Sequence, residues 1–427
     1  MNVSEFVADL HGRGMELWVD GDQLRYKAPP EMITEEILSE MGAHKLEIMT
    51  HLRGSEDAAS TAETLASEGA LQEPMTAPEV ETPLVAGGRL ESRFLGKSGL
   101  KISEFGLGPY SSTMVAPGAG EEFNRLLDVY AEAGGNYLDL SNVYTMSEKR
   151  VGEWLRGKDR EAYVIASKVG MDTGGDGPNQ QGLSRKHIMA SIDRSLAALK
   201  SDYLDVYYTH TWDGGTPLEE TLTTLNDIVR SGKARYIGVS NFTGWQLQKA
   251  VDITRYEHLE PVVVSQMQYN LLDRYPEWEQ LPVCRNEGVG VTAWGSLAAG
   301  WLTGRYRRGM AAEEEGDRIR IESQLGMRHN TLDFRDTERT WRTLDTLLEV
   351  AIELDKTPAQ VALNWLSTRA GVVPILGPRN VDQLSEALGA VGWRLSGDQA
   401  ARLEEASKLP PIMPHMFIER VNPPDRM

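Results

Sequence analysis

Residues 182–210, GLSRKHIMASIDRSLAALKSDYLDVYYTH, place a helical pattern directly before a strand pattern. Residues 184–199 carry apolar side chains at the three- and four-residue spacing of an amphipathic helix. Residues 203–210 are rich in Tyr, Val and Leu, as buried strands are, and they end in His210. Repetition of such helix–strand units is typical of α/β folds.

The same alternation recurs from about residue 89 to the C-terminal region. Eight apolar runs are predicted to be strands: Phe105–Gly108, Asn136–Leu140, Tyr163–Lys168, Tyr203–His210, Tyr236–Ser240, Val262–Gln266, Val289–Trp294 and Val372–Leu376. Helical patterns such as residues 218–231 separate them, so we expect an α/β chain with a (β/α)8 TIM barrel. A hairpin of Arg93–Leu95 with Leu100–Ile102 should precede the first strand, and the polar stretch 305–335 should form an elaborated loop after the seventh.

Two further segments precede this region in the 427-residue chain. Residues 54–88 contain seven acidic residues and no basic or aromatic residue. Such a segment buries too little apolar area to offset its ordering entropy, which predicts a disordered acidic linker. A surface helix over residues 58–70 is the alternative, because Ala and Glu favour helices. The predicted organisation is therefore a small compact unit over residues 1–53, a linker over 54–88 and a barrel over 89–427.

Composition excludes several classes of protein. Lys and Arg total 44 against 63 Asp and Glu, giving a net charge of −19 that would repel nucleic acid. The single cysteine, Cys284, cannot form an internal disulfide, which fits a reducing cytoplasm. We find no apolar run of about 18 residues and no signal-peptide pattern at the start, and so expect no membrane insertion. The His/Asp pairs of a metal-dependent hydrolase are lacking, so no metal is expected.

Polar side chains stand at the carboxyl ends of the predicted strands, where barrel enzymes place their chemistry. They are Asp139, Lys168, His210, Ser240, Asn241, Gln266 and Trp294, with Tyr144 shortly after the second strand. Any one of these is unremarkable by itself, since single polar residues often end strands. Their recurrence at successive strand ends predicts a catalytic site.

Asp, Tyr, Lys and His together suit proton donation. A lysine cation favours the phenolate form of a nearby Tyr, and an Asp keeps that Lys charged and oriented. Such a Tyr can protonate a carbonyl oxygen near neutral pH, while a His orients the same oxygen. The hydride that must reach the carbonyl carbon comes from a cofactor, because no side chain supplies one.

Five segments resemble the aldo-keto reductase superfamily, and they occur in that family's order. They are NYLDLSNVYTMSEKRVGEWL (136–155), VIASKVG (164–170), the opening segment 182–210, GKARYIGVSNF (232–242) and TAWGSLAAGWLTGRY (292–306). The resemblance implies the fold and a catalytic tetrad of Asp139, Tyr144, Lys168 and His210. Tyr144 would be the general acid, Lys168 and Asp139 would tune it, and His210 would polarise the carbonyl.

The same resemblance implies a nicotinamide cofactor. Its cofactor-binding residues would be Ser240, Asn241, Gln266, Trp294, Leu297, Gly300, Leu302, Gly304, Arg305, Gly377, Arg379 and Gln383. Arg379 would pair with a 2′-phosphate, which favours NADPH/NADP+ over NADH. Tyr110 and Trp212 would line the substrate pocket, although Trp212 could instead be a surface-loop aromatic.

Residues 1–53 resemble the TubC-type docking domains of nonribosomal peptide synthetases. The likeness covers an αββαα pattern with the hairpin ELWVDGDQLRYK (16–27), an Ala-Pro-Pro break and a closing helix. Such domains accept the C-terminal docking segment of another synthetase or polyketide synthase by strand addition. Trp18 and Tyr26 suit either that peptide or the small domain's own core. Pairing of two docking domains would permit a homodimer.

Together the two resemblances imply a cytoplasmic reductase of secondary metabolism. It would reduce an aldehyde or ketone, carrier-bound or free, during nonribosomal peptide or polyketide biosynthesis. The alternative is an adaptor or regulatory subunit that binds the cofactor with little catalysis.

Overall fold

The computed structural model describes residues 15–20, 23–27, 48, 89–109, 119–144, 146–174, 177–310, 328–410 and 412–421. The chain divides into two compact units, Met1–Val80 and Glu81–Met427. Their boundary falls inside the segment 54–88. That predicted linker, Tyr110 and the helices expected around the N-terminal hairpin lie outside the described residues.

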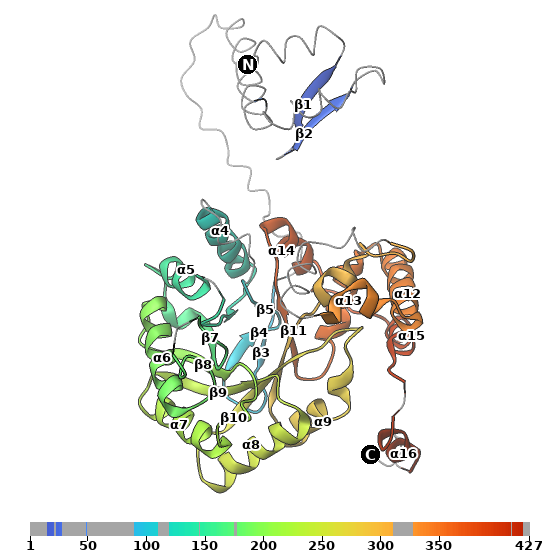
Figure 1. Ribbon diagram of the computed structural model, residues 1–427. Coiled ribbons are helices and arrows are strands. Elements are labelled where there is room, and N and C mark those ends of the chain that lie inside the picture. Colours follow the sequence, from blue (N-terminus) through green and yellow to red (C-terminus); the bar gives the residue numbers. More distant parts are fainter. Residues whose placement is uncertain are drawn as a thin grey trace, which may run out of the picture. The chain divides into compact units, whose positions relative to one another are not determined.

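The N-terminal unit contains the predicted hairpin. Strand β1 (Glu16–Asp20) pairs antiparallel with β2 (Gln23–Lys27), and Asp20 lies opposite Gln23 (Figure 1). The two strands form a sheet of their own. The predicted hairpin is therefore confirmed.

Eight parallel strands of the second unit close into a barrel (Figure 1). They are β5 (Gly106–Leu107), β6 (Tyr137–Asp139), β7 (Val164–Val169), β8 (Leu204–Thr209), β9 (Ala234–Ser240), β10 (Val262–Gln268), β11 (Gly290–Trp294) and β12 (Val372–Leu376). Each pairs with the next along the chain, and β12 pairs with β5 to close the ring. The predicted (β/α)8 barrel is confirmed, and each predicted run matches one strand to within two residues at either end.

Helices alternate with the strands and form the outer layer. They are α4 (Ala119–Glu132), α5 (Ser147–Trp154), α6 (Arg185–Leu199), α7 (Leu218–Arg230), α8 (Gly244–Tyr256), α9 (Gln280–Glu287), α12 (Glu338–Leu354), α13 (Pro358–Ser367), α14 (Val381–Leu388) and α15 (Gly397–Ser407). Local sequence sets their starts. The Ser184 side chain accepts from the His187 amide to begin α6, and Thr357 with Gln360 forms a capping box before α13.

The predicted second hairpin fills the amino-terminal end of the barrel. It consists of β3 (Ser92–Phe94) and β4 (Lys101–Ser103). At its turn Gly96 has φ +59°, and a Cβ there would lie 2.4 Å from the Gly290 backbone nitrogen, so only glycine fits. Leu95 and Ile102 are buried with the barrel's interior side chains. The side chains predicted to form the site lie at the opposite, carboxyl ends of the strands.

The described residues of the second unit also form several short elements. They are η3 (Arg160–Ala162), η4 (Tyr275–Glu277), η5 (Ala298–Thr303), η7 (Arg328–Asn330), α11 (Leu332–Arg335) and α16 (His415–Val421). The described part of the predicted loop 305–335 contains η7 and α11. A buried ion pair from Arg335 to Asp273, at 2.7 Å, ties this loop to the segment after β10.

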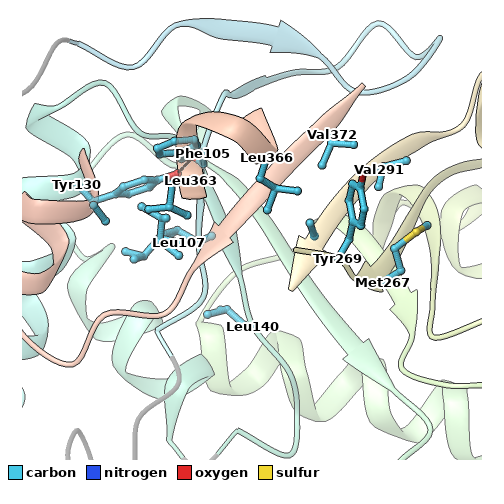
Figure 2. Packing of buried hydrophobic residues seen from close by; sticks show 14 of the residues in the cluster. Phe105, Leu107, Tyr130, Leu140, Met267, Tyr269, Val291, Leu363, Leu366 and Val372 are labelled. Atoms are coloured by element: carbon cyan, nitrogen blue, oxygen red, sulfur yellow. Dashed lines mark hydrogen bonds between the residues drawn. The ribbon is translucent and has the colours of Figure 1, made fainter. Parts of the chain in front are cut away.

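The main hydrophobic core lies between the strands and the outer helices (Figure 2). Leu363 and Leu366 of α13 belong to it together with Leu107 of β5 and Val372 of β12. Each such side chain contributes roughly 1.5–3 kcal/mol when wholly buried. This packing holds the strand ends, and hence the site, in fixed positions.

Candidate active site

A buried ion pair joins the ends of β6 and β7. Lys168 Nζ donates to Asp139 Oδ2 at 2.7 Å and to the Leu140 carbonyl oxygen at 2.8 Å. Both charged side chains are almost wholly shielded from solvent. Burial alone would lower the pKa of Lys168, but the Asp139 carboxylate and the nearby Tyr144 raise that pKa above its ordinary value. The lysine therefore remains a cation inside the barrel.

Tyr144 packs against this cation. Lys168 Nζ lies 4.8 Å from the centroid of the Tyr144 ring. The loop between β6 and α5 holds the Tyr144 backbone, because its N–H donates to the Ser141 carbonyl oxygen and its own carbonyl accepts from the Ser147 amide, each at 3.0 Å. A cation so close favours the anionic form of a phenol and eases loss of the phenolic proton.

His210 follows β8 directly and is buried. Its ring meets the Tyr144 ring edge-on, with centroids 5.7 Å apart and planes at 83°. Burial, together with the Lys168 charge, lowers the pKa of His210 to about 3. The imidazole is consequently neutral near pH 7 and has one N–H with which to donate a hydrogen bond.

The four residues predicted for catalysis thus converge from three neighbouring strands. Asp139 ends β6, Lys168 lies on β7, and Tyr144 and His210 stand in the loops after β6 and β8. A proton-bearing phenol beside a fixed cation and a neutral imidazole is suited to acid catalysis on a carbonyl oxygen.

Gln266 of β10 connects Asp139 of β6 to Thr292 of β11. Its Nε2 donates to Asp139 Oδ1 at 2.9 Å and to Thr292 Oγ1 at 3.2 Å. Both amide hydrogens are thereby engaged, and Oε1 remains as the acceptor of this buried side chain. Oε1 could accept a hydrogen bond from an external N–H, such as that of a carboxamide.

Asn241 connects three further strand ends. Its Nδ2 donates to the His210 carbonyl oxygen at 2.9 Å and to Ser240 Oγ at 3.1 Å. Its Oδ1 accepts from Trp294 Nε1 at 2.9 Å, which fixes the half-buried indole. Asn241 has φ 56°, a left-handed conformation that Asn tolerates better than most residues. The predicted Ser240, Asn241 and Trp294 are therefore brought together beside His210.

The segment after β11 offers accessible backbone. Gly300 has φ +99°, and a Cβ there would meet no atom within 4 Å, so open space adjoins the chain. Gly304 and Arg305 are exposed and Leu297 is half-buried. The Leu302 side chain is wholly buried in the core, so only its backbone is available to a ligand.

The start of α14 carries the remaining predicted positions. Gly377 and Arg379 are exposed in the loop after β12. The Arg379 amide donates to Gln383 Oε1 at 3.0 Å, and the Gln383 amide donates to Asn380 Oδ1 at 2.9 Å. Gln383 thus orders the loop that presents the Arg379 guanidinium.

These residues fit the parts of a nicotinamide dinucleotide. The Gln266 acceptor lies beside the tetrad, where a carboxamide is needed. Open space beside Gly300 leaves the backbone there accessible, as contact with a pyrophosphate requires. The exposed guanidinium groups of Arg305 and Arg379 suit phosphate oxygens.

Trp212 stands two residues after His210 and is partly buried against the core. Its ring meets those of Phe242 and Trp245 edge-on, with centroids 5.3 Å apart in each case. Trp212 is therefore one member of an aromatic cluster formed by the loops after β8 and β9 and the first turn of α8, and Trp245 of α8 is exposed.

Sequence reasoning missed several polar partners. Ser141 Oγ lies 3.1 Å from His210 Nδ1, Thr292 holds Gln266, and the Leu140 carbonyl holds Lys168. Ser141 carried a signal, since it is a small polar residue between Asp139 and Tyr144. The contact of Lys168 with the Leu140 carbonyl had no signal in the sequence, because every residue has a backbone carbonyl.

Within the described ranges, no three His, Cys, Asp or Glu side chains are grouped to hold a metal ion. None of the helices in that same part of the chain is long and apolar enough to cross a membrane.

Comparison with known proteins adds a match for each unit. Residues 3–54 match the TubC N-terminal docking domain, and residues 105–408 match the aldo/keto reductase family. The N-terminal resemblance found in the sequence is thus confirmed at the level of the family model.

Individual relatives cover most of the second unit. A probable voltage-gated potassium channel subunit beta of Arabidopsis thaliana is 33% identical over 71% of this chain and 91% of its own. L-glyceraldehyde 3-phosphate reductase of Escherichia coli is 34% identical over 71% of this chain and 88% of its own. Norsolorinic acid reductase B of Aspergillus parasiticus is 32% identical over 69% of this chain and 76% of its own. The chain belongs to the aldo/keto reductase family and is an oxidoreductase of that family.

Proposed function

We propose that this protein uses NADPH to reduce an aldehyde or ketone to an alcohol during nonribosomal peptide or polyketide biosynthesis. The observation that carries the proposal is the buried Asp139–Lys168 pair against Tyr144, with the neutral His210 beside it. A buried ion pair is costly to maintain, and here it adjoins a group that can release a proton.

Each residue has a separate task in this proposal. A nicotinamide held by residues such as Gln266 and Asn241 would supply the hydride that the carbonyl carbon receives. Tyr144 Oη gives its proton to the carbonyl oxygen, and Lys168 stabilises the phenolate that remains. Asp139 keeps Lys168 charged and oriented, and the His210 N–H donates to the same carbonyl oxygen. Run in reverse, these residues would support oxidation of the alcohol.

The preference for NADPH rests on exposed arginines. Arg379, presented by the ordered loop before α14, has the planar fork that pairs with a 2′-phosphate. Arg305 follows the open backbone at Gly300 and suits the pyrophosphate. NADH lacks the 2′-phosphate and would gain nothing from Arg379.

The biosynthetic role rests on the N-terminal unit. We assign residues 1–53 to docking, 54–88 to a flexible tether and 89–427 to the reductase. A two-stranded sheet of β1 and β2 can add a third strand, which suits the C-terminal docking segment of a synthetase or polyketide synthase. Tethering would raise the effective concentration of a carrier-bound substrate without any new active-site contact. A reducing cytoplasm suits the buried, unpaired Cys284.

The substitution Tyr144→Phe tests the chemistry. It should reduce NADPH oxidation with a panel of aldehydes by at least about 10³-fold, while NADPH affinity stays within about twofold. Tyr256→Phe, on an exposed side chain of α8, is the matched control and should be unaffected. Turnover by Tyr144→Phe comparable to that of the wild type would contradict the proposal that Tyr144 is the general acid.

An adaptor is the second candidate, because the potassium channel subunit beta named above is also a relative. Both candidates bind NADPH, so turnover separates them. Full-length protein that binds NADPH but oxidises it with no aldehyde or ketone would favour the adaptor.

Docking is tested separately from chemistry. Removal of residues 1–53 should leave the rate with a free aldehyde unchanged and lower the rate with a carrier-bound carbonyl presented by the partner synthetase. Equal rates with the carrier-bound substrate before and after removal would contradict the docking role.

A further inference from the structure

Ser141 joins the backbone of the β6–α5 loop to the catalytic histidine. Its side chain is wholly buried, and its Oγ lies 3.1 Å from His210 Nδ1. The Val143 amide donates to the same Oγ at 3.4 Å. In the described part of the chain these are the two hydrogen-bond partners of the Ser141 hydroxyl.

The direction of the bond to His210 follows from these two partners. A backbone N–H can only donate, so Ser141 Oγ is the acceptor for Val143 and its own hydrogen remains to be placed. If His210 Nδ1 also donated to Oγ, that hydroxyl hydrogen would be buried without an acceptor. Buried donors are rarely left unsatisfied. The hydroxyl therefore donates to Nδ1, and the ring proton resides on Nε2.

The backbone contacts of His210 do not determine this choice. Its amide donates to the Val169 carbonyl at 2.7 Å, and its carbonyl accepts from Asn241 Nδ2 at 2.9 Å. Both contacts fix the main chain and do not determine which ring nitrogen carries the proton. The orientation and tautomer of the ring are set through Nδ1.

We propose that Ser141 is a positioning residue that holds His210 as the Nε2–H tautomer, so that Nε2–H is the donor to the substrate's carbonyl oxygen. The inference rests on the proposed function of His210 and deepens it. Ser141 touches no reacting atom and acts only through His210.

The test compares Ser141→Ala with Ser265→Ala in the full-length protein. Ser265 is also a buried serine on a barrel strand, and its hydroxyl has no hydrogen-bond partner among the described residues. Nitrogen-15 NMR of histidine-labelled protein reports which ring nitrogen carries the proton, and the His210 signals are assigned by their loss in His210→Gln.

We expect wild type and Ser265→Ala to show an unprotonated Nδ1 and a protonated Nε2 at pH 7. Ser141→Ala should show a mixture of tautomers and a kcat lower by about 3- to 10-fold, the effect of one lost neutral hydrogen bond, with unchanged NADPH affinity. Ser141→Thr, which keeps a hydroxyl at the same position, should show the wild-type tautomer.

A protonated Nδ1 in the wild type, or an unchanged tautomer in Ser141→Ala, would overturn the inference. Failure of the proposed function gives a different pattern. In that case His210→Gln would leave carbonyl reduction unaffected, whatever the tautomer that the spectrum reports.

Discussion

Gln266 donates a hydrogen bond to Asp139 Oδ1 at 2.9 Å, so a side chain predicted to bind the nicotinamide also fixes the carboxylate that orients Lys168. One amide therefore connects the proposed cofactor contact to the proposed proton donor. The substitution Gln266→Met should weaken both functions, because it removes the donor to Asp139 and the acceptor Oε1 together.

We expect Gln266→Met to lower kcat and to raise the dissociation constant of NADPH, each by at least about 10-fold, as hydrogen bonds to charged groups are worth roughly 1.5–3 kcal/mol. Stopped-flow kinetics and fluorescence titration measure the two effects. Thr292→Val leaves the bond from Nε2 to Asp139 intact and removes the contacts of Thr292 Oγ1 with Gln266 and Tyr208, so it should have a smaller effect on kcat. An equal loss in both variants would contradict the proposed link.

Removing one partner of the buried ion pair should destabilise the barrel. Lys168→Met leaves Asp139 buried without its cation and should lower the free energy of unfolding by about 3–5 kcal/mol. The double variant Asp139→Leu, Lys168→Met should recover most of that stability but no activity. Urea unfolding followed by tryptophan fluorescence measures the change. Lys233→Met, which removes the cation from an exposed pair with Asp193, should cost no more than about 1 kcal/mol.

His210 should make stability depend on acid pH. Its pKa is lowered from 6.5 to about 3 in the folded protein, so the unfolded chain takes up this proton first as the pH falls. The contribution to stability is complete above pH 6.5 and is lost progressively toward pH 3. By pH 4.5 the loss amounts to about 2–3 kcal/mol.

The measurement is the difference in unfolding free energy between pH 7.5 and pH 4.5. His210→Gln should show a smaller difference than the wild type by roughly that amount. His258→Asn is the control, because His258 is exposed and its left-handed backbone suits Asn. The same pH dependence in wild type and His210→Gln would show that His210 is not the group responsible.

Arg379→Ala should change the choice of cofactor. Loss of the guanidinium removes a charge-assisted contact with the 2′-phosphate, so the dissociation constant of NADPH should rise by about 10- to 100-fold and that of NADH by less than about twofold. Arg394→Ala is the matched control, since Arg394 is an exposed arginine whose charge acts on Arg93 of β3. Parallel losses for NADPH and NADH would exclude a role in recognising the 2′-phosphate.

The eight strands could be predicted because each is a short apolar run with a distinct local pattern. Val164–Val169 and Val372–Leu376, for example, are buried along their whole length and read as apolar runs in the sequence. Strand boundaries were less exact: β5 spans only Gly106–Leu107 within the longer predicted run. Pairing with both neighbours decides where a barrel strand ends, and a single run does not contain that information.

The sequence also predicted that Asp139, Tyr144, Lys168 and His210 belong to one site, and the structure brings these four side chains together. Their catalytic roles stay predictions. The assignment of Leu302 to the cofactor could not be refined in advance, because only packing shows that its side chain is wholly inside the core. Tyr110 and the linker 54–88 lie outside the described residues, so those expectations stay predictions.

By itself, the sequence determined which residue types stand at the strand ends and that eight such ends belong to one barrel. Only the tertiary structure decided how those side chains share their hydrogen bonds. Contacts such as Gln266 to Asp139 and Ser141 to His210 join residues 127 and 69 positions apart. They depend on strand register and rotamer, which are fixed when the closed barrel packs against its helices and not by any local pattern.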